Sequence, residues 1–196
     1  MTWALGARRI GILGGSFNPA HDAHVHISRL ALKRLDLDEI WWLVSPQNPL
    51  KSPTGMAPLD KRLAHARTMA VGLPIRVMAL EAALGTRYTV DTLTALKRRW
   101  PKVRFVWLMG ADNLASFHRW RAWPRIMKLV PVAIFDRPRY SETGPRAKMA
   151  LRFRAARHPE RAARLLPDQA PPAWVFIHNP RHAQSATAIR AQGGGW

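Results

Sequence analysis

The sequence predicts an α/β fold in which a parallel sheet of five to six strands has helices on both faces. Short apolar runs alternate along the chain with segments whose apolar residues recur every three or four positions, and this alternation is typical of successive strands and helices. The run 40–44 is apolar at every position, as in a strand covered on both sides. A Rossmann-like, doubly wound sheet is therefore expected, and 196 residues fit a single domain, 1–196.

The elements expected from these patterns follow in order along the chain. Strands are expected at 9–13, 40–44, 75–79, 103–109, 130–135 and 173–178, and helices at 22–35, 59–71, 90–100 and from 185 onward. The proline-containing segments 45–58 and 138–172 are expected to be loops, and the second leaves a helix within 147–156 open. No internal repeat or linker divides the chain, so all the strands are expected to belong to one domain.

Charge is the most unusual property of the composition. Lys and Arg total 31 against 12 Asp and Glu, which gives a net charge of +19. Such a surface attracts polyanions, whether nucleic acid, acidic membranes or phosphorylated small molecules, although an Arg-rich composition can also be the habit of a whole proteome. The chain has no cysteine, its N-terminus does not resemble a signal peptide, and its apolar runs are too short to span a bilayer. A cytoplasmic protein is expected.

Residues with functional side chains follow the predicted strands. His21 and His24 follow the first strand, Asp112 follows the fourth, and Ser185 and Arg190 follow the last. Ligands of doubly wound sheets bind at the carboxyl ends of the strands. We therefore expect these side chains to gather around a ligand at one edge of the sheet.

The first of these segments has the chemistry of a phosphate site. Gly14 and Gly15 let backbone N–H groups approach a phosphate and permit positive φ. His21 and His24 are three residues apart, so at a helix start they lie about 60° apart around the axis, on one face. The positive end of the helix dipole then adds to two imidazoles that can donate hydrogen bonds to developing negative charge. A His pair by itself is more often a polar surface or a metal site.

The whole run at 14–24, Gly-Gly-Ser-Phe-Asn-Pro-Ala-His-Asp-Ala-His, resembles the signature of the nucleotidylyltransferase superfamily. It is most similar to the nicotinate-nucleotide adenylyltransferase branch, in which a glycine stands where this chain has Ala23. The resemblance implies that His21 and His24 are catalytic and bind the α- and β-phosphate region of ATP. It also implies contacts with ATP from the preceding turn, namely from Gly14, Gly15, Ser16 and Phe17.

A second segment, Ser185-Ala-Thr-Ala-Ile-Arg190, resembles the other signature of that family, although Gln184 stands where the family has Ile. By itself the segment indicates only a capped helix with an exposed arginine. The resemblance implies that Ser185, Thr187 and Arg190 contact the phosphates of ATP. The resemblance also implies that Lys51 and Arg137 bind ATP, although Leu50 stands before Lys51 where the family has His.

Three further matches concern the second substrate. The segments 88–93 and 110–114, followed by Trp120, resemble the nicotinate branch in sequence and order. The resemblance implies that Trp120 stacks on the pyridine ring and that Asp112 reaches a ribose hydroxyl. The residues implied to bind nicotinate mononucleotide are Ser16, Tyr88, Thr89, Asp112, Trp120 and Arg121, with the backbone N–H groups of Thr89 and Arg121 receiving the carboxylate. A lone Trp would otherwise more often be a packing residue.

The activity implied by the resemblance is adenylyl transfer from ATP to nicotinate mononucleotide, which gives deamido-NAD and pyrophosphate in NAD biosynthesis. Mg²⁺ is expected to arrive with ATP, because no carboxylate cluster marks a protein metal site. Nicotinamide mononucleotide or another phosphorylated acceptor remains an alternative. A homo-oligomer also remains open, and family members usually continue with another helix or two beyond the position of Trp196.

A protein of another class is the second alternative, namely a basic nucleic-acid-binding protein on the same fold. The net charge motivates it, together with a series of arginines in the segment 138–172: Arg152, Arg154, Arg157, Arg161 and Arg164. Such a series is more often a solvated helix face. A nucleic-acid partner is therefore not expected, although the charge does not exclude it.

Overall fold

The computed structural model describes residues 7–46, 55–137 and 146–178, and the structural statements below concern these residues. Within them, seven parallel strands form one sheet: β1 (Arg9–Gly15), β2 (Glu39–Val44), β3 (Ile75–Met78), β4 (Arg104–Gly110), β5 (Val132–Phe135), β6 (Arg157–His158) and β7 (Trp174–Ile177). Their order is β3-β2-β1-β4-β5-β7-β6. The winding reverses between β1 and β4, which is where doubly wound sheets open a ligand crevice.

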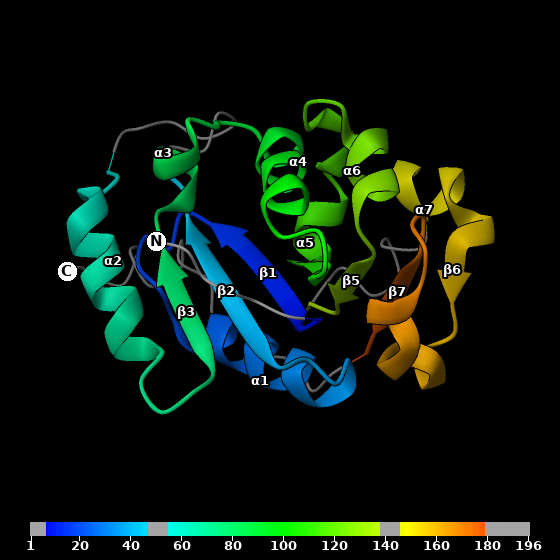
Figure 1. Cartoon of the computed structure of the whole chain (residues 1–196), viewed down its shortest axis with the longest axis horizontal. Coiled ribbons are helices and arrows are strands. Elements are labelled where there is room, and N and C mark those ends of the chain that lie inside the picture. The colour runs from blue at the N-terminus through cyan, green and yellow to red at the C-terminus, as the bar shows by residue number, and fades with distance from the viewer. Residues whose placement is uncertain (1–6, 47–54, 138–145, 179–196) are drawn as a thin grey trace.

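Helices cover both faces of this sheet (Figure 1). The α-helices are α1 (Asp22–Arg34), α2 (Leu59–Met69), α3 (Leu80–Leu84), α4 (Thr89–Arg99), α5 (Ala111–Leu114), α6 (Trp123–Leu129) and α7 (Lys148–Arg152). Short 3-10 helices are η1 (Phe117–Arg119), η3 (Arg154–Ala156) and η4 (Glu160–Asp168). No helix in the described ranges has the length and apolarity needed to cross a membrane.

Two buried apolar clusters, one on each face, hold the layers together. On one face, α4, α6 and α7 contribute Val90, Leu93, Leu96, Ile126, Met127 and Met149 to a core with Ile10, Ile12 and Trp107 of the sheet. On the other face, α1, α2 and η4 contribute Ile27, Ala31, Ala66 and Leu166 to a core with Trp42, Leu108 and Val175. Side chains that alternate along each strand supply both cores, because successive residues of a strand point to opposite faces.

The observed fold confirms the predicted class and corrects its details. All six predicted strands are present, each within two residues of the expected start and end. The count of five to six is nevertheless too low, because β6 adds a seventh strand at the sheet edge, paired with Trp174 and Val175 of β7. A strand of only two residues, Arg157–His158, is too short to show an alternating pattern.

The segment 138–172, predicted as a loop, contains ordered elements wherever the structure describes it. The helix left open at 147–156 is present as α7 and η3, and β6 and η4 follow it. The expected single helix face of arginines is wrong, because Arg152, Arg154, Arg157 and Arg161 lie on four different elements. All five arginines of the series are exposed, so the expectation that they are solvated is confirmed.

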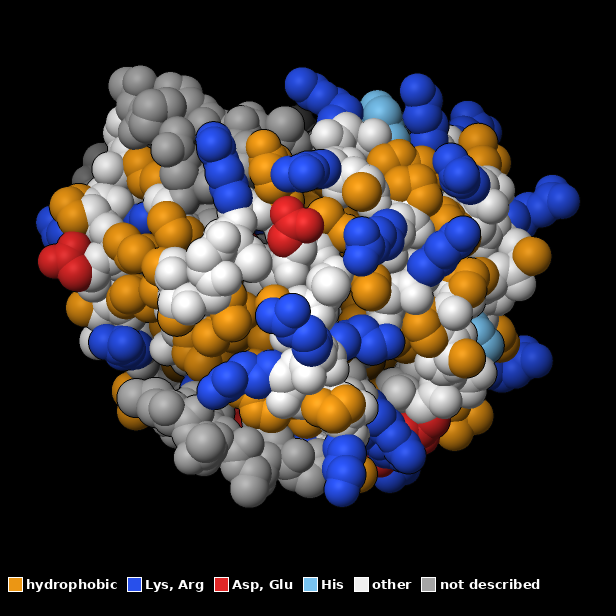
Figure 2. Space-filling view, turned by 45° about the horizontal axis from the view of Figure 1, so that its top comes forward, with side chains coloured by type: hydrophobic (Ala, Val, Ile, Leu, Met, Phe, Trp, Pro, Cys, Tyr) orange, Lys and Arg blue, Asp and Glu red, His pale blue; other side chains and the backbone are white. Residues whose placement is uncertain are grey.

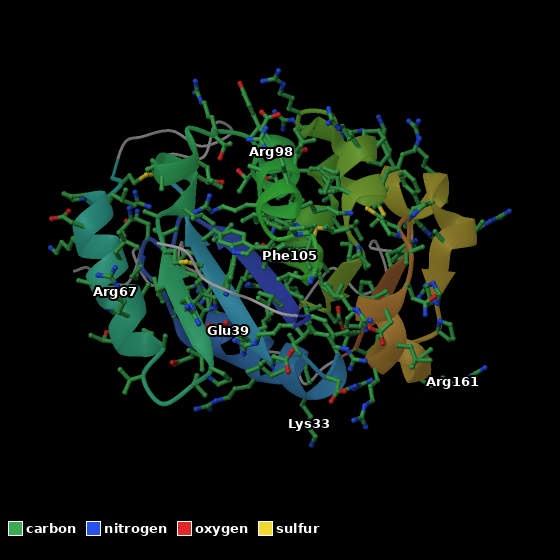
Figure 3. The ribbon with its side chains drawn as sticks, in the orientation of Figure 1. Lys33, Glu39, Arg67, Arg98, Phe105 and Arg161 are labelled. Atoms are coloured by element: carbon green, nitrogen blue, oxygen red, sulfur yellow. The ribbon has the colours of Figure 1, made fainter. Side chains whose placement is uncertain are left out.

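The amino ends of the strands carry most of the ion pairs found in the described residues. Arg9 at the start of β1 pairs with Asp36 after α1 and with Asp168 at the end of η4, each at 2.7 Å. Arg34 of α1 pairs with Glu160 of η4 at 2.7 Å. Glu39, labelled in Figure 3, starts β2 at the same end of the sheet and pairs with Arg8 and Arg76. This network ties the last third of the described chain to the first and leaves the opposite edge of the sheet for a ligand.

Candidate active site

The turn after β1 is built around a buried phenylalanine. Phe17 is 1% exposed and has a left-handed φ of 46°. Such a φ is strained for a residue other than glycine and persists only where the surroundings hold it. The ring of Phe17 stacks on Trp42 of β2 with centroids 5.1 Å apart and lies 4.6 Å from the ring of His24. The turn is therefore anchored to the sheet directly beside the predicted catalytic pair.

The two glycines before this turn do not have the conformation that the sequence suggested. Positive φ in the described part of the turn occurs at Phe17 and at neither Gly14 nor Gly15. Glycine is needed at position 14 for packing instead, because a Cβ there would lie 2.5 Å from Cη2 of Trp107 on β4. Glycine therefore lets the large indole of Trp107 pack directly on the backbone of β1.

The histidine pair caps α1. His21 is the N-cap residue and is 5% exposed, and its backbone N–H donates to Nδ1 of His24 at 3.2 Å. The backbone N–H of His24 donates in turn to the carbonyl of His21 at 2.8 Å, and the two imidazole rings lie 4.0 Å apart. The predicted placement of both rings together at a helix N-terminus is therefore what the structure contains. Free N–H groups and the helix dipole make this position favourable for phosphate.

A buried polar chain fixes the backbone of His24. Trp42 Nε1 donates to Ser28 Oγ at 2.8 Å, and Ser28 Oγ donates to the carbonyl oxygen of His24 at 2.8 Å. Ser28 is fully buried. Because buried hydrogen bonds are costly to break, α1 cannot rotate without losing them. Trp42 and Ser28 cannot be recognised from the sequence as supports of the site, because they resemble ordinary members of a strand and a helix.

Asp112 and Arg137 meet at the carboxyl ends of β4 and β5. Oδ1 of Asp112, in the first turn of α5, lies 3.5 Å from Nε of Arg137, which directly follows β5. Gly110 makes this approach possible, because a Cβ there would lie 2.3 Å from Oδ1 of Asp112 and 2.9 Å from Nε of Arg137. The sequence placed Asp112 on the acceptor side and Arg137 on the ATP side, and the structure brings them into contact.

The remaining acceptor residues lie around the start of α4 and the end of η1. Tyr88 is the N-cap residue of α4, Thr89 is the first residue of that helix, and the guanidinium of Arg121 lies 4.7 Å from the centroid of the Tyr88 ring. Trp120 is half-buried and packs edge-on against Trp107 at 6.1 Å. Trp107 therefore contacts both Gly14 of the phosphate turn and Trp120 of the acceptor group.

Four predicted residues lie outside the described ranges. These are Lys51, Ser185, Thr187 and Arg190, all implied to contact ATP. Of the described candidates, Gly14, Gly15, Ser16, Phe17, His21 and His24 form one group at the end of β1 and the start of α1. The second group consists of Asp112, Trp120 and Arg121, which come after β4, Arg137, which follows β5, and Tyr88 and Thr89 at the start of α4, where the Tyr88 ring contacts Arg121.

Comparison with known proteins shows the family to which the chain belongs. A family model described as cytidylyltransferase-like matches residues 12–192. A relative from Methylorubrum extorquens, named "Probable nicotinate-nucleotide adenylyltransferase", is 53% identical over 94% of this chain and all of its own length. The chain belongs to the nicotinate-nucleotide adenylyltransferase family. A relative of the same name from Parvibaculum lavamentivorans is 50% identical over 95% of this chain and 92% of its own length.

Solved structures support the fold of this nicotinate-nucleotide adenylyltransferase family member. The Plasmodium falciparum nicotinic acid mononucleotide adenylyltransferase complexed with NaAD superposes with a TM-score of 0.71 at 18% identity, covering 94% of this chain and 83% of that one. The same protein complexed with APC gives a TM-score of 0.70 at 17% identity. Membership of the family makes the chain a nucleotidyltransferase, and the Rossmann-like fold predicted from sequence is confirmed.

Proposed function

We propose that this chain transfers the adenylyl group of ATP to nicotinate mononucleotide and releases pyrophosphate, with the residues of the two groups above as its site. The phosphate oxygen of the mononucleotide attacks the α-phosphorus of ATP, the bond to the β-phosphate breaks, and the dinucleotide deamido-NAD forms. No side-chain nucleophile is needed. The protein acts by positioning the substrates and stabilising charge, as in phosphoryl transfer generally.

The adjacent imidazoles of His21 and His24 are the observation that carries the proposal. Two imidazoles 4.0 Å apart at a helix N-terminus, one of them almost fully buried, provide donors where negative charge builds up on the α- and β-phosphates. Ser16 and Phe17 add backbone groups of the preceding turn. Arg137 follows β5, two strands along the sheet from β1, and adds a guanidinium, which suits phosphate oxygens.

The second group of residues supports a pyridine nucleotide with a carboxylate as the acceptor. The half-buried indole of Trp120 offers an aromatic face to an electron-poor pyridinium ring. Thr89 stands at the N-terminus of α4, where free backbone N–H groups favour an anion, and Arg121 brings a positive charge beside Tyr88. Asp112 supplies a carboxylate that can accept a hydrogen bond from a ribose hydroxyl.

Mg²⁺ fits this account as part of the MgATP substrate. The described residues contain no group of three or more His, Asp or Glu side chains that could hold a metal ion. Asp112, an acidic side chain just after β4, already contacts Arg137. Bound to the triphosphate, the cation would neutralise charge on the leaving pyrophosphate.

The unit that carries out this reaction is proposed to be the whole chain, 1–196, acting as one domain. Strands from Arg9–Gly15 to Trp174–Ile177 share one sheet, and the ion pairs of Arg9 join both ends of the described chain. A cytoplasmic location, where ATP and the mononucleotide are available, remains a prediction.

Product analysis tests the proposal. The purified chain is incubated with MgATP and nicotinate mononucleotide, and products are separated by chromatography while pyrophosphate is measured in parallel. Equimolar deamido-NAD and pyrophosphate are expected. Release of ADP or AMP without a dinucleotide, or a dinucleotide formed only when nicotinamide mononucleotide replaces the nicotinate form, would contradict it.

A further inference from the structure

A buried arginine on α2 holds the turn that carries the phosphate site. Arg62 is 1% exposed, which is exceptional for an arginine. Its guanidinium donates from Nη1 to the carbonyl oxygens of Ser16 and Ser45, each at 2.7 Å. It also donates from Nη2 to Pro46 at 2.9 Å and from Nε to Ala57 at 2.9 Å. One side chain therefore joins the end of β1, the end of β2 and the segment before α2.

All the described partners of Arg62 are backbone carbonyls. No ion pair with a carboxylate is found for it within the described ranges, and burial lowers the pKa of its guanidinium from the ordinary value. An arginine nonetheless stays protonated in proteins. A full positive charge, whose partners among the described residues are all peptide dipoles, therefore lies directly behind the phosphate turn. The low polarity there strengthens its attraction for an anion.

The contact with Ser16 fixes the direction of one peptide unit. The peptide between Ser16 and Phe17 is trans, so its carbonyl and its N–H point to opposite sides. Since the Ser16 carbonyl points at Arg62, the N–H of Phe17 points away from the guanidinium. Within the described residues no acceptor is found for that N–H. It is available to a phosphate oxygen.

A second side chain of α2 supports the same turn. His65 lies three residues after Arg62 and hence on the same face of the helix. Its Nε2 lies 3.1 Å from the carbonyl oxygen of Ala20, the residue before His21. A carbonyl can only accept, so Nε2 carries the proton. Asn18 completes the anchorage, because its side chain donates to the Gly55 carbonyl and accepts from the Ala57 N–H, both at 3.0 Å.

We propose that Arg62 is a positioning residue for the adenylyl transfer, assisted by His65. It orients the Ser16–Phe17 peptide toward the phosphates and supplies a buried positive charge behind them. The inference rests on the proposed function, because it assigns the phosphates of ATP to this turn. Arg62 itself touches no substrate in this account, and its effect passes through the backbone of the turn.

The test compares Arg62→Met and Arg62→Lys with Arg67→Met. Arg67 is an exposed arginine of the same helix and is labelled in Figure 3, so it controls for loss of charge on α2. Three quantities are measured for each variant: kcat with ATP and nicotinate mononucleotide, KM for the mononucleotide, and the Kd of ATP by calorimetry without acceptor. A thermal unfolding curve establishes that each variant is folded.

Loss of the guanidinium is expected to lower kcat roughly 30-fold or more in Arg62→Met, which is the order of effect produced by a misplaced reacting group. The Kd of ATP rises about tenfold, which corresponds to about 1.4 kcal/mol, and KM for the mononucleotide stays within about threefold. A purely structural role would lower the unfolding temperature without changing kcat and the Kd of ATP more than KM for the mononucleotide. A folded Arg62→Met variant whose kcat and Kd match those of Arg67→Met overturns the proposal.

Two variants keep the test decisive if Arg62→Met does not fold. Arg62→Lys keeps the charge but has no planar fork for four carbonyls, so an intermediate loss of kcat, roughly tenfold, is expected. His65→Ala is expected to lower kcat about three- to fivefold. Wild-type values in both variants overturn the proposal. If the wild-type chain makes no dinucleotide, the proposed function fails, and the Kd of ATP still decides the role of Arg62.

Discussion

The two sides of the crevice differ in how firmly their residues are held. On the β1 side, Phe17 and His21 are almost fully buried, and Arg62, Trp42 and Ser28 hold the backbone around them. On the β4 side, the side chain of Arg121 is 61% exposed and that of Asp112 is 40% exposed. If the proposed roles hold, the phosphate side is expected to be formed before substrates bind, and the acceptor side to be completed by the acceptor.

The two sides would differ in this way because stabilising a transition state and recognising a substrate place different demands on a side chain. Groups that stabilise a transition state work best when they need no rearrangement at the moment of reaction. Groups that recognise a substrate can be partly exposed before it arrives, and binding energy then orders them. The first side is therefore expected to control kcat, and the second to control KM and the choice of acceptor.

The largest expected effect comes from the rigid side. His24→Ala removes an imidazole from the phosphate site and is expected to lower kcat by about 10²- to 10³-fold, the cost of removing one donor at a developing charge. Pyrophosphate release at saturating substrates measures it. Arg29→Ala, an exposed position of the same helix, is the matched control and is expected to keep wild-type turnover. Near-normal turnover of His24→Ala would remove His24 from the chemistry.

A smaller effect, of a different kind, is expected on the open side. Trp120→Leu removes the aromatic face but keeps apolar contact with Phe117 and Trp107. KM for nicotinate mononucleotide is expected to rise about tenfold, because such stacking is worth about 1–1.5 kcal/mol, while kcat changes by less than about threefold. Steady-state kinetics with the mononucleotide varied distinguish the two. A fall in kcat with constant KM would mean that Trp120 does not bind the acceptor.

Glu81 adds a dependence on pH to the stability of the fold. It lies on α3, which packs against α4, and burial raises its pKa from the ordinary 4.5 to about 7. The folded state therefore keeps the proton that the unfolded state loses above pH 4.5, so the stability contributed at low pH declines between about pH 4.5 and pH 7. Glu81→Gln is expected to raise the free energy of unfolding at pH 8 by about 1–2 kcal/mol, allowing for partial exposure.

Glu160 provides the matched comparison for Glu81. Burial alone would raise the pKa of Glu160, but hydrogen bonds from His178 and Arg34 outweigh it and lower the pKa. Its stabilisation is present above the ordinary pKa and is lost as pH falls through the lowered value, so Glu160→Gln is expected to destabilise the protein at pH 8. Urea unfolding at pH 5 and pH 8 measures both variants. The same sign for both at pH 8 would contradict the assignment.

The smallest effect is expected at Arg121. Its side chain is exposed, lies over Tyr88 and is 3.8 Å from Asp91, so water screens most of its charge. Arg121→Gln is expected to reduce the preference for nicotinate over nicotinamide mononucleotide about three- to fivefold. The ratio of the two kcat/KM values gives the result, and an unchanged ratio would limit recognition of the carboxylate to the backbone.

The positive surface charge is not concentrated on one of the two sides of the site. Figure 2 shows Lys and Arg side chains spread over the face it presents, among hydrophobic ones and with few acidic side chains. The ion pairs of Arg9 and Arg34 gather instead at the amino ends of the strands. A nucleic-acid partner remains the alternative from sequence, and a filter-binding assay without salt-dependent affinity would dispose of it.

The strands, the main helices and the position of the site were predictable because they depend on local patterns. Apolar runs gave the strands within two residues, and the string 14–24 placed the His pair at a helix start. Short elements such as β6 and α3 were not predictable, since they are too brief to show a period. The longer η4 is a 3-10 helix that contains Pro167, so it does not show the α-helical period. Their place is set by packing against distant segments, as the pairing of β6 with β7 shows.

The supports of the site could not be predicted from sequence for a different reason. A periodicity argument assigns apolar residues to the core of α2 and expects Arg62 to be exposed, yet Arg62 is more deeply buried than Leu59 or Leu63. Only the three-dimensional convergence of carbonyls from 16, 45, 46 and 57 explains its burial. The positive φ of Phe17 and the fit of Trp107 over Gly14 likewise depend on contacts between strands distant in sequence.

The ratio of kcat/KM for nicotinate mononucleotide to that for nicotinamide mononucleotide, measured in the wild type and in His24→Ala, tests the division of the site most directly. The account predicts a ratio of about 10² or more in the wild type, and the same ratio in His24→Ala despite its much lower kcat, because the acceptor is chosen by the other side of the crevice. A wild-type ratio near one, or a ratio that collapses in His24→Ala, would contradict it.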